Sequence, residues 1–129
     1  MANVRISCPI FPSEDPQRVA HAVTNIFPGI ELAMEEDRFT ADTTDLEHFA
    51  LQIRRQRILD TTRSVLMKGR RGERSVFNMN KQAAYAGKIS FVEERTILGT
   101  IKVTIEADDI TAFIESLAPQ TVDGEEVLI

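Results

Sequence analysis

Alternation of apolar and polar residues predicts strands near both ends of the chain. Residues 3–10 carry an apolar side chain at every second position, and residues 98–105 repeat this pattern. A strand with one buried face and one hydrated face has this period of two. Shorter segments with strand character are residues 30–34, 75–79 and 89–92. The acidic stretch EEDRFTADTTD, residues 35–45, has room for one more short strand.

Apolar residues spaced three and four apart predict three helices. The first follows the SEDP stretch, which offers a capping residue and acidic side chains that suit a helix start, and Pro28 stops it. The second is the longest and carries apolar residues on two sides, so we expect it to contact both its own sheet and another helix or subunit. This second helix extends from about Asp45 to Lys68. The third helix runs from the Asp108–Asp109 pair to Pro119.

Strands interspersed with helices in this way predict an α+β fold. We expect a two-layer sandwich in which helices pack on one face of a mostly antiparallel sheet. A doubly wound parallel sheet fits less well, because several strands alternate cleanly instead of being apolar throughout. A chain of 129 residues is about the size of one domain, so we assign residues 1–129 to a single unit.

The stretch FNMNKQAAYAG, residues 77–87, combines an apolar strand with a dense set of small residues. Asn80 is a favourable N-cap, so residues 81–86 can form a short helix that Gly87 ends in the left-handed conformation. Small residues permit close packing, which makes the segment a structural corner. The free N–H groups at the helix start, next to Lys81, also allow an anion to bind there.

Composition places the protein among ordinary soluble domains, with 43% hydrophobic and 27% charged residues. No apolar run approaches the roughly 20 residues that cross a bilayer, and the first residues lack the features of a signal peptide. The single cysteine, Cys8, cannot form an internal disulfide and falls on the apolar face of the first strand. We therefore expect a cytoplasmic protein with no membrane contact.

Common catalytic motifs are missing from the sequence. It contains neither a phosphate-binding loop nor a dinucleotide-binding glycine motif. One cysteine and two histidines, His21 and His48, are too few for a structural zinc site, and both histidines fall on polar helix sides. We expect no enzyme activity, no catalytic residue, no metal, no cofactor and no small-molecule substrate.

Positive charge is concentrated in one segment. Residues 54–88 hold ten Lys and Arg side chains and two acidic ones, a net charge of +8, whereas the remaining residues carry −13. This division is typical of a patch that binds phosphates, and also of a hydrated surface whose charges pair with acidic neighbours. The possible RNA or anion ligands are Arg54, Arg55, Arg63, Lys68, Arg70, Arg71, Arg74, Asn80, Lys81 and Gln82. With one tyrosine and no tryptophan, any RNA binding would depend on backbone phosphates and weaken with salt.

A second polar feature lies inside the longest predicted helix. Residues three or four apart share one helix face, and here they are Gln52, Gln56, Asp60 and Arg63. One interpretation is a hydrogen-bonded network that fixes the helix against a neighbour. The other is a polar groove in which Arg63 faces a ligand. A small-anion or nucleotide site would then combine Asp60, Arg63, Asn80, Lys81 and Gln82.

Four stretches together resemble a known family: RRQRILDTTRSVL, FNMNKQAAYAGKISFV, LGTIKVTIE and SLAPQTVDG. They are similar to an archaeal group of small proteins, uncharacterised protein family 0201. The resemblance covers nearly the whole chain, with NKQAAYAGK as its most specific part. The family usually has leucine at the position of Met79, and an acidic-aromatic pair where this chain has Glu115 and Ser116.

The resemblance implies a fold similar to that of a large-subunit ribosomal protein that contacts ribosomal RNA, and a dimeric assembly. It implies no activity. The basic loop, residues 68–74, lies between the matching stretches, so binding through it would be a property of this chain.

Two hypotheses follow for the function. The first is a non-enzymatic, homodimeric structural or protein-interaction domain; the alternative is an RNA-associated module that contacts phosphates through residues 54–88. The first predicts acidic side chains among the arginines and an apolar side of the long helix buried by a partner. The second predicts one contiguous positive face. A small-ligand site would instead require a pocket beside Asn80 into which Arg63 points.

Overall fold

The structure, a computed structural model, describes residues 2–93, 99–122 and 125–126. Its centre is a six-stranded sheet in the order β2-β3-β1-β6-β5-β4, in which every pairing is antiparallel. The strands are β1 (Asn3–Pro9), β2 (Ala33–Glu35), β3 (Arg38–Thr43), β4 (Arg70–Arg71), β5 (Arg74–Met79) and β6 (Ile101–Glu106). A separate two-stranded sheet contains β7 (Thr121–Val122) and β8 (Glu125–Glu126).

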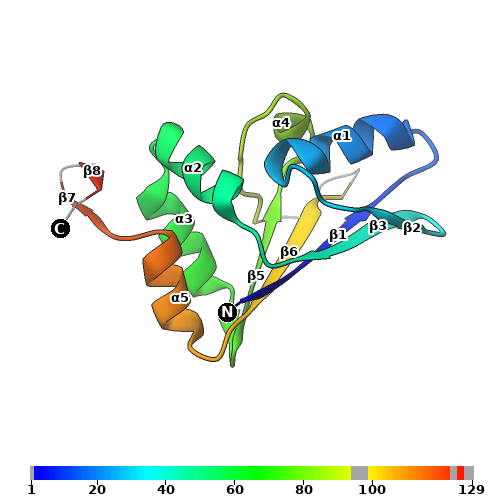
Figure 1. Cartoon of the computed structure of the whole chain (residues 1–129). Coiled ribbons are helices and arrows are strands. Elements are labelled where there is room, and N and C mark those ends of the chain that lie inside the picture. The colour runs from blue at the N-terminus through cyan, green and yellow to red at the C-terminus, as the bar shows by residue number, and fades with distance from the viewer. Residues whose placement is uncertain (1, 94–98, 123–124, 127–129) are drawn as a thin grey trace.

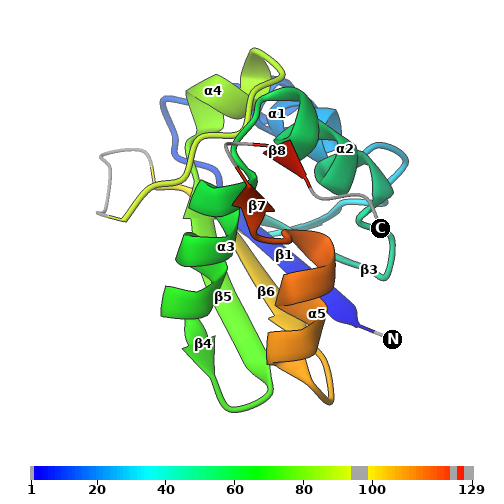
Figure 2. The same ribbon diagram turned by 90° about the vertical axis from the view of Figure 1, so that its left-hand side faces the viewer.

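Helices pack on one face of the main sheet (Figure 1, Figure 2). They are α1 (Pro16–Ile26), α2 (Glu47–Arg55), α3 (Leu59–Lys68), α4 (Lys81–Tyr85) and α5 (Ile110–Leu117). This arrangement confirms the predicted two-layer α+β sandwich. Its second face, which the described helices leave uncovered, carries the polar residues of the alternating strands.

The buried face of the sheet follows from the alternation in the sequence. Val4, Ile6 and Cys8 of β1 are at most 1% exposed. They pack with the apolar sides of the helices in one hydrophobic core. Within it the Phe49 and Phe77 rings lie 5.7 Å apart, which joins α2 to β5. Because fully burying a large apolar side chain contributes roughly 1.5–3 kcal/mol, this layer dominates the stability of the fold.

The single long helix predicted for residues 45–68 is wrong, because the chain turns between α2 and α3. Arg57 adopts a left-handed conformation with a φ of 56°, and the amide of Ile58 donates to the Ile53 carbonyl. The turn explains the two apolar sides seen in the sequence. Each half directs its own stripe, such as Ile53 in α2 and Leu66 in α3, into the same core.

The strand prediction needs smaller corrections. The strand expected at residues 89–92 is reduced to one bridge between Met79 and Phe91. Two backbone hydrogen bonds, from Asn80 to Ser90 and from Val92 to Asn78, flank this bridge. The strand expected at residues 30–34 starts later, as β2, and the acidic stretch does contain a strand, β3. Residue 98, the expected start of the last long strand, lies outside the described residues.

Candidate functional site

The basic residues of segment 54–88 are distributed over α2, α3, the turn between them, the β4–β5 hairpin, α4 and the segment after α4. Figure 2 shows these elements. Five of these cations contact carboxylates from other parts of the chain. The ion pairs are Arg54–Glu126, Arg63–Glu115, Lys68–Glu93, Arg74–Glu106 and Lys81–Glu14. Acidic neighbours are therefore interleaved with the basic side chains, as the interaction-domain hypothesis predicts.

Arg54 binds the C-terminal strands to α2. Its Nε and Nη2 atoms donate to the two Glu126 carboxylate oxygens at 2.9 and 3.0 Å, and Nη1 donates to the Ala50 and Leu117 carbonyls. Hydrogen bonds from the guanidinium lower the pKa of the Glu126 carboxyl below its usual value. Every nitrogen of this guanidinium has a protein acceptor, so Arg54 contributes to the architecture.

Asp60 and Arg63 lie next to each other on α3, but they contact different parts of the chain. The Thr121 amide and hydroxyl both donate to the Asp60 carboxylate, and these hydrogen bonds lower its pKa. Arg63 Nη2 lies 3.6 Å from Glu115 on α5, and its buried Nε has no hydrogen-bond partner. The two side chains thus join α3 to the C-terminal region.

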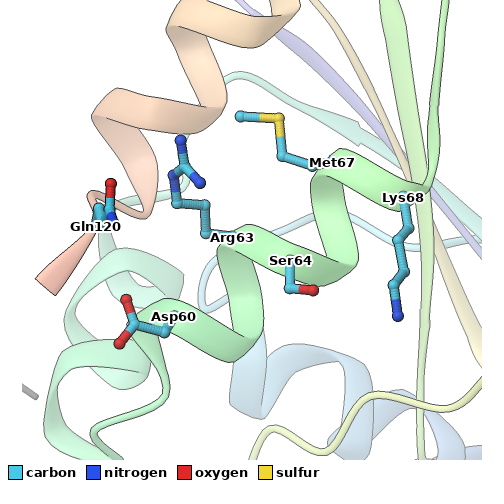
Figure 3. Close-up of a pocket in the computed structure, with 6 residues that line it drawn as sticks. All are labelled: Asp60, Arg63, Ser64, Met67, Lys68 and Gln120. Carbon is cyan, nitrogen blue, oxygen red and sulfur yellow. The ribbon is translucent and has the colours of Figure 1, made fainter.

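A cavity of about 570 Å³ lies against this face of α3. Asp60, Arg63, Ser64, Met67, Lys68 and Gln120 line it, as Figure 3 shows. Arg63 extends toward α5, whereas Lys68 extends in a different direction, away from α5. The two cations therefore do not converge on one point of the cavity.

The β4–β5 hairpin carries the other basic residues of the loop. Arg70 donates to the Thr111 hydroxyl at 2.6 Å, and Arg71 donates to the carbonyls of Lys68 and Arg70. Arg74 Nη2 lies 3.4 Å from Glu106. All three arginines are exposed, but each has a contact within the chain.

Lys81 is buried and bonded to protein groups, which differs from the exposed anion-binding lysine that the sequence suggested. Its side chain is 8% exposed, and Nζ donates to the Pro9 carbonyl at 2.6 Å and to Glu14 at 3.0 Å. The ammonium group also lies 5.2 Å from the centroid of the Phe11 ring. The lysine therefore holds the turn after β1 in place, with its charge directed toward protein groups.

The corner around Lys81 otherwise has the predicted geometry. The Ala83 amide donates to the Asn80 side chain at 2.8 Å, which caps α4, and Gly87 has a left-handed φ of 81°. Asn25 of α1 donates to the carbonyls of Ala84 and Tyr85, so α4 packs tightly on α1. This explains the small residues of the motif.

Gln52 and Gln56 form the hydrogen-bonded network that the sequence suggested. Gln52 donates to Gln56 and to the Gly87 carbonyl. Gln56 donates to the Ile89 carbonyl at 2.9 Å and accepts from the Ile89 amide at 2.8 Å. The two glutamines thereby attach the segment after α4 to the end of α2.

The small-ligand combination of Asp60 and Arg63 with residues 80–82 is separated in the structure. The first two residues line the cavity on α3, whereas Lys81 and Gln82 line a hollow of about 190 Å³ beside α1. In Figure 1, α4 lies next to α1, whereas α3 lies beside α5. The structure therefore does not bring these residues into one pocket.

A larger hollow, of about 610 Å³, lies on the uncovered face of the sheet. It contains two cations outside segment 54–88, Arg38 of β3 and Lys102 of β6. Sequence analysis missed both, because each is an isolated charge on a predicted strand or connection. The signal that could have found them is the strand alternation, which places both on the hydrated face.

Cys8 is a small buried side chain, as the sequence predicts, with 0% exposure. Burial raises the pKa of its thiol to about 11, so it stays protonated at neutral pH. Across the residues that the structure describes, no three metal-ligating side chains gather at one point. Of the helices in the same residues, none combines the length and apolar character needed to cross a membrane.

The fold and these contacts define a small α+β domain whose basic residues mainly hold its own elements together. A family model described as "RNA binding" matches residues 3–107. A UPF0201 protein of Methanothermobacter thermautotrophicus is 38% identical over 130 residues, covering 98% of each chain. A UPF0200/UPF0201 protein of Archaeoglobus fulgidus is also 38% identical, but the present chain spans only 39% of its length. The chain belongs to uncharacterised protein family 0201.

Solved structures agree with this assignment. The crystal structure of a UPF0201 protein from Methanococcus jannaschii superposes with a TM-score of 0.89, at 35% identity over 98% of this chain and 99% of that one. A second UPF0201 crystal structure gives 0.86 at 36% identity, over 97% of this chain and 99% of that one. The predicted family is therefore confirmed.

Proposed function

We propose that this protein is a non-enzymatic interaction domain that pairs with a second copy of itself. The observation that carries the proposal is that five of the ten cations in the basic segment pair with the chain's own carboxylates, as in Arg63–Glu115 and Arg74–Glu106. Cations engaged in this way are poorly available to phosphates. Dimeric assembly is also what the resemblance to family 0201 implies.

Leu51 supports a partner surface on α2. It is 46% exposed, although α2 otherwise directs its large apolar side chains into the core. Beside it lies a hollow of about 200 Å³ lined in part by Phe27 and Pro28. Asp45, Glu47 and His48 line its polar side. An exposed leucine next to a hollow with one apolar wall is suited to a self-complementary contact, in which Leu51 of each copy enters the hollow of the other.

The test is the mass in solution, measured by light scattering across a range of protein concentrations. A dimer has twice the 14.5 kDa of one chain. Leu51→Glu should shift the protein to the monomer mass, whereas Met34→Glu, at a more exposed position (57%) on the edge strand β2, should not. A monomer at all concentrations overturns the proposal; dissociation by Met34→Glu alone overturns the choice of surface.

RNA binding is the second candidate, favoured by the description of the family model that matches residues 3–107. In the part of the chain that the structure describes, four exposed arginines of the basic segment have no carboxylate partner: Arg55, Arg57, Arg70 and Arg71. They flank α3 in two pairs, and a helix of ten residues separates these by about 15 Å. Phosphate contacts at two such points would be possible along one RNA backbone.

A salt-dependent titration with structured and single-stranded RNA tests this candidate. Binding through phosphates predicts an affinity that falls linearly with salt on logarithmic axes. Replacing Arg55, Arg57, Arg70 and Arg71 with alanine should then abolish it. Because phosphate attraction is strongest at low salt, absence of binding there would exclude this function.

A further inference from the structure

The hollow of about 610 Å³ on the uncovered sheet face has features of a ligand site. Its polar lining includes Ser7 of β1, Arg38 of β3, Lys102 of β6 and Asn78 of β5. Phe11, from the turn after β1, forms part of its apolar wall. A volume in this range, with a few convergent polar groups against apolar walls, is typical of pockets for small molecules.

Two cations converge in this hollow over the central strand β1. The Arg38 Nη1 atom donates to the Ser7 hydroxyl at 2.6 Å. Ser7 is paired directly with Lys102 on the neighbouring strand β6. Since adjacent strands are about 4.8 Å apart, the two positive side chains lie on opposite sides of Ser7 on the same face.

Nearby carboxylates do not neutralise this pair of cations. Glu35 is opposite Arg38 in the β2–β3 register, but its carboxylate accepts from the Thr40 hydroxyl. Glu93 lines the hollow and pairs with Lys68 at 3.7 Å. Across the described residues, neither Arg38 nor Lys102 has a carboxylate at ion-pair distance.

Two other arginines on the same sheet face have carboxylate partners. Arg5 of β1 lies 3.2 Å from Asp42, and Arg74 of β5 lies 3.4 Å from Glu106. Both of these pairs sit toward the opposite end of the strands. Among the described cations of β1, β3, β5 and β6, only Arg38 and Lys102 lack an ion pair. Both line the hollow, where like charges repel and a bound anion would relieve the repulsion.

We propose that this hollow binds a small phosphorylated molecule, with its phosphate between Arg38 and Lys102. The planar guanidinium of Arg38 keeps donors beyond the one used by Ser7, and arginine recognises phosphate oxygens in pairs. The Thr100 hydroxyl donates to Asn78 Oδ1 at 2.7 Å, which leaves the Asn78 amide N–H groups as further donors. A phosphate alone is smaller than the hollow, so the ligand carries an organic group.

Lys81 gives this site a rigid wall. It binds the Pro9 carbonyl and Glu14, and Glu14 in turn accepts from the Phe11 amide at 3.0 Å. On the other side, a Cβ atom at Gly99 would lie 2.8 Å from the Pro9 side chain and 3.3 Å from the Phe11 ring. Glycine there permits the close approach that fixes both residues, and a preformed wall lowers the cost of ordering on binding.

The test compares two double variants that each remove two positive charges from the same sheet face. Arg38→Gln/Lys102→Gln removes the unpaired cations, and Arg5→Gln/Arg74→Gln removes paired ones. The probes are inorganic phosphate, AMP and ribose 5-phosphate, with binding followed by calorimetry and by phosphorus NMR. We expect an organic phosphate to bind the unmodified protein. Loss of two charge-assisted contacts should weaken it about tenfold or more in the first variant, with about twofold or less change in the second.

Three outcomes would overturn the proposal. They are absence of binding by all three probes at millimolar concentration, equal weakening in both variants, and binding of a short oligoribonucleotide without any binding of AMP or ribose 5-phosphate. Both variants replace exposed side chains, and equal thermal unfolding midpoints verify that they are folded. The site does not depend on dimerisation, so it can be tested whatever the mass in solution.

Discussion

Lys81 and Glu14 form the most enclosed ion pair among the described residues, with side-chain exposures of 8% and 11%. Taking charges out of water is costly, so such a pair is stable only when both partners are present and further hydrogen bonds satisfy them. Here the Pro9 carbonyl and the Phe11 amide supply those bonds. The pair therefore fixes the turn after β1 instead of binding an external anion.

Replacing Lys81 with methionine should lower the free energy of unfolding by about 3 kcal/mol, because Glu14 would remain buried without its cation. Urea denaturation measures the change. Lys68→Met is the matched control, since its partner Glu93 and Lys68 itself are more than two-thirds exposed, and should cost about 0.5 kcal/mol or less. Adding Glu14→Gln to Lys81→Met should restore part of the loss; equal costs for the two lysines would contradict the buried-pair argument.

Cys8 should make the free energy of unfolding depend on pH in the alkaline range. Burial raises the pKa of its thiol from an ordinary value of 9.0 to about 11, so the native state holds this proton more tightly than the unfolded chain. The resulting stabilisation is complete below pH 9 and is lost as the pH rises toward 11. Between pH 8 and 10.5, unfolding free energy should fall more steeply for the native protein than for Cys8→Ala. Parallel curves would show that the thiol does not contribute.

The turn between α2 and α3 depends on one residue with an unusual backbone conformation. Arg57 is held at a φ of 56°, a conformation that costs a residue with a Cβ about 1 kcal/mol. Arg57→Gly should therefore stabilise the protein by up to that amount in a denaturation experiment. Ser64→Gly, at an exposed position inside α3, should instead destabilise it by about 0.5 kcal/mol. Destabilisation by both changes would mean that the left-handed turn carries no strain.

Prediction from sequence succeeded where the signal was local. The period-two pattern of β1 and β6 and the N-cap at Asn80 depend on neighbouring residues, and both have the expected geometry. The turn at Arg57 was missed because neither glycine nor proline marks it. Its stabilising contact, from Gln56 to Ile89, joins residues 33 positions apart.

Contacts between distant residues also decide the candidate sites, and the sequence pattern does not reveal them. Lys81 and Glu14 are 67 positions apart, and nothing in the spacing of either residue indicates that they meet. Arg38 and Lys102 line one hollow only because β1 lies between β3 and β6. Clustering of charge along the sequence therefore indicates segment 54–88, whereas the two cations of the hollow come from strands distant in sequence.

For the whole molecule, the arrangement of charge decides between the two candidate functions. The chain carries a net charge of −5, and acidic side chains from distant segments are located beside the basic segment. If these acids prevent binding to polyanions, their removal should create it. Exchanging Glu93, Glu106 and Glu115 for glutamine would free Lys68, Arg74 and Arg63 from their partners.

This triple variant should bind heparin and RNA at low salt, whereas the unmodified protein should not. Its net charge is −2, so the control must have the same charge: Glu31, Glu36 and Glu47, all exposed, changed to glutamine. Elution from a heparin column with increasing salt measures the difference. Because long-range attraction depends on the total charge, equal retention of the two variants would show that net charge alone controls binding. Retention of the unmodified protein would instead favour RNA binding, because its cations would then reach phosphates despite their carboxylate partners.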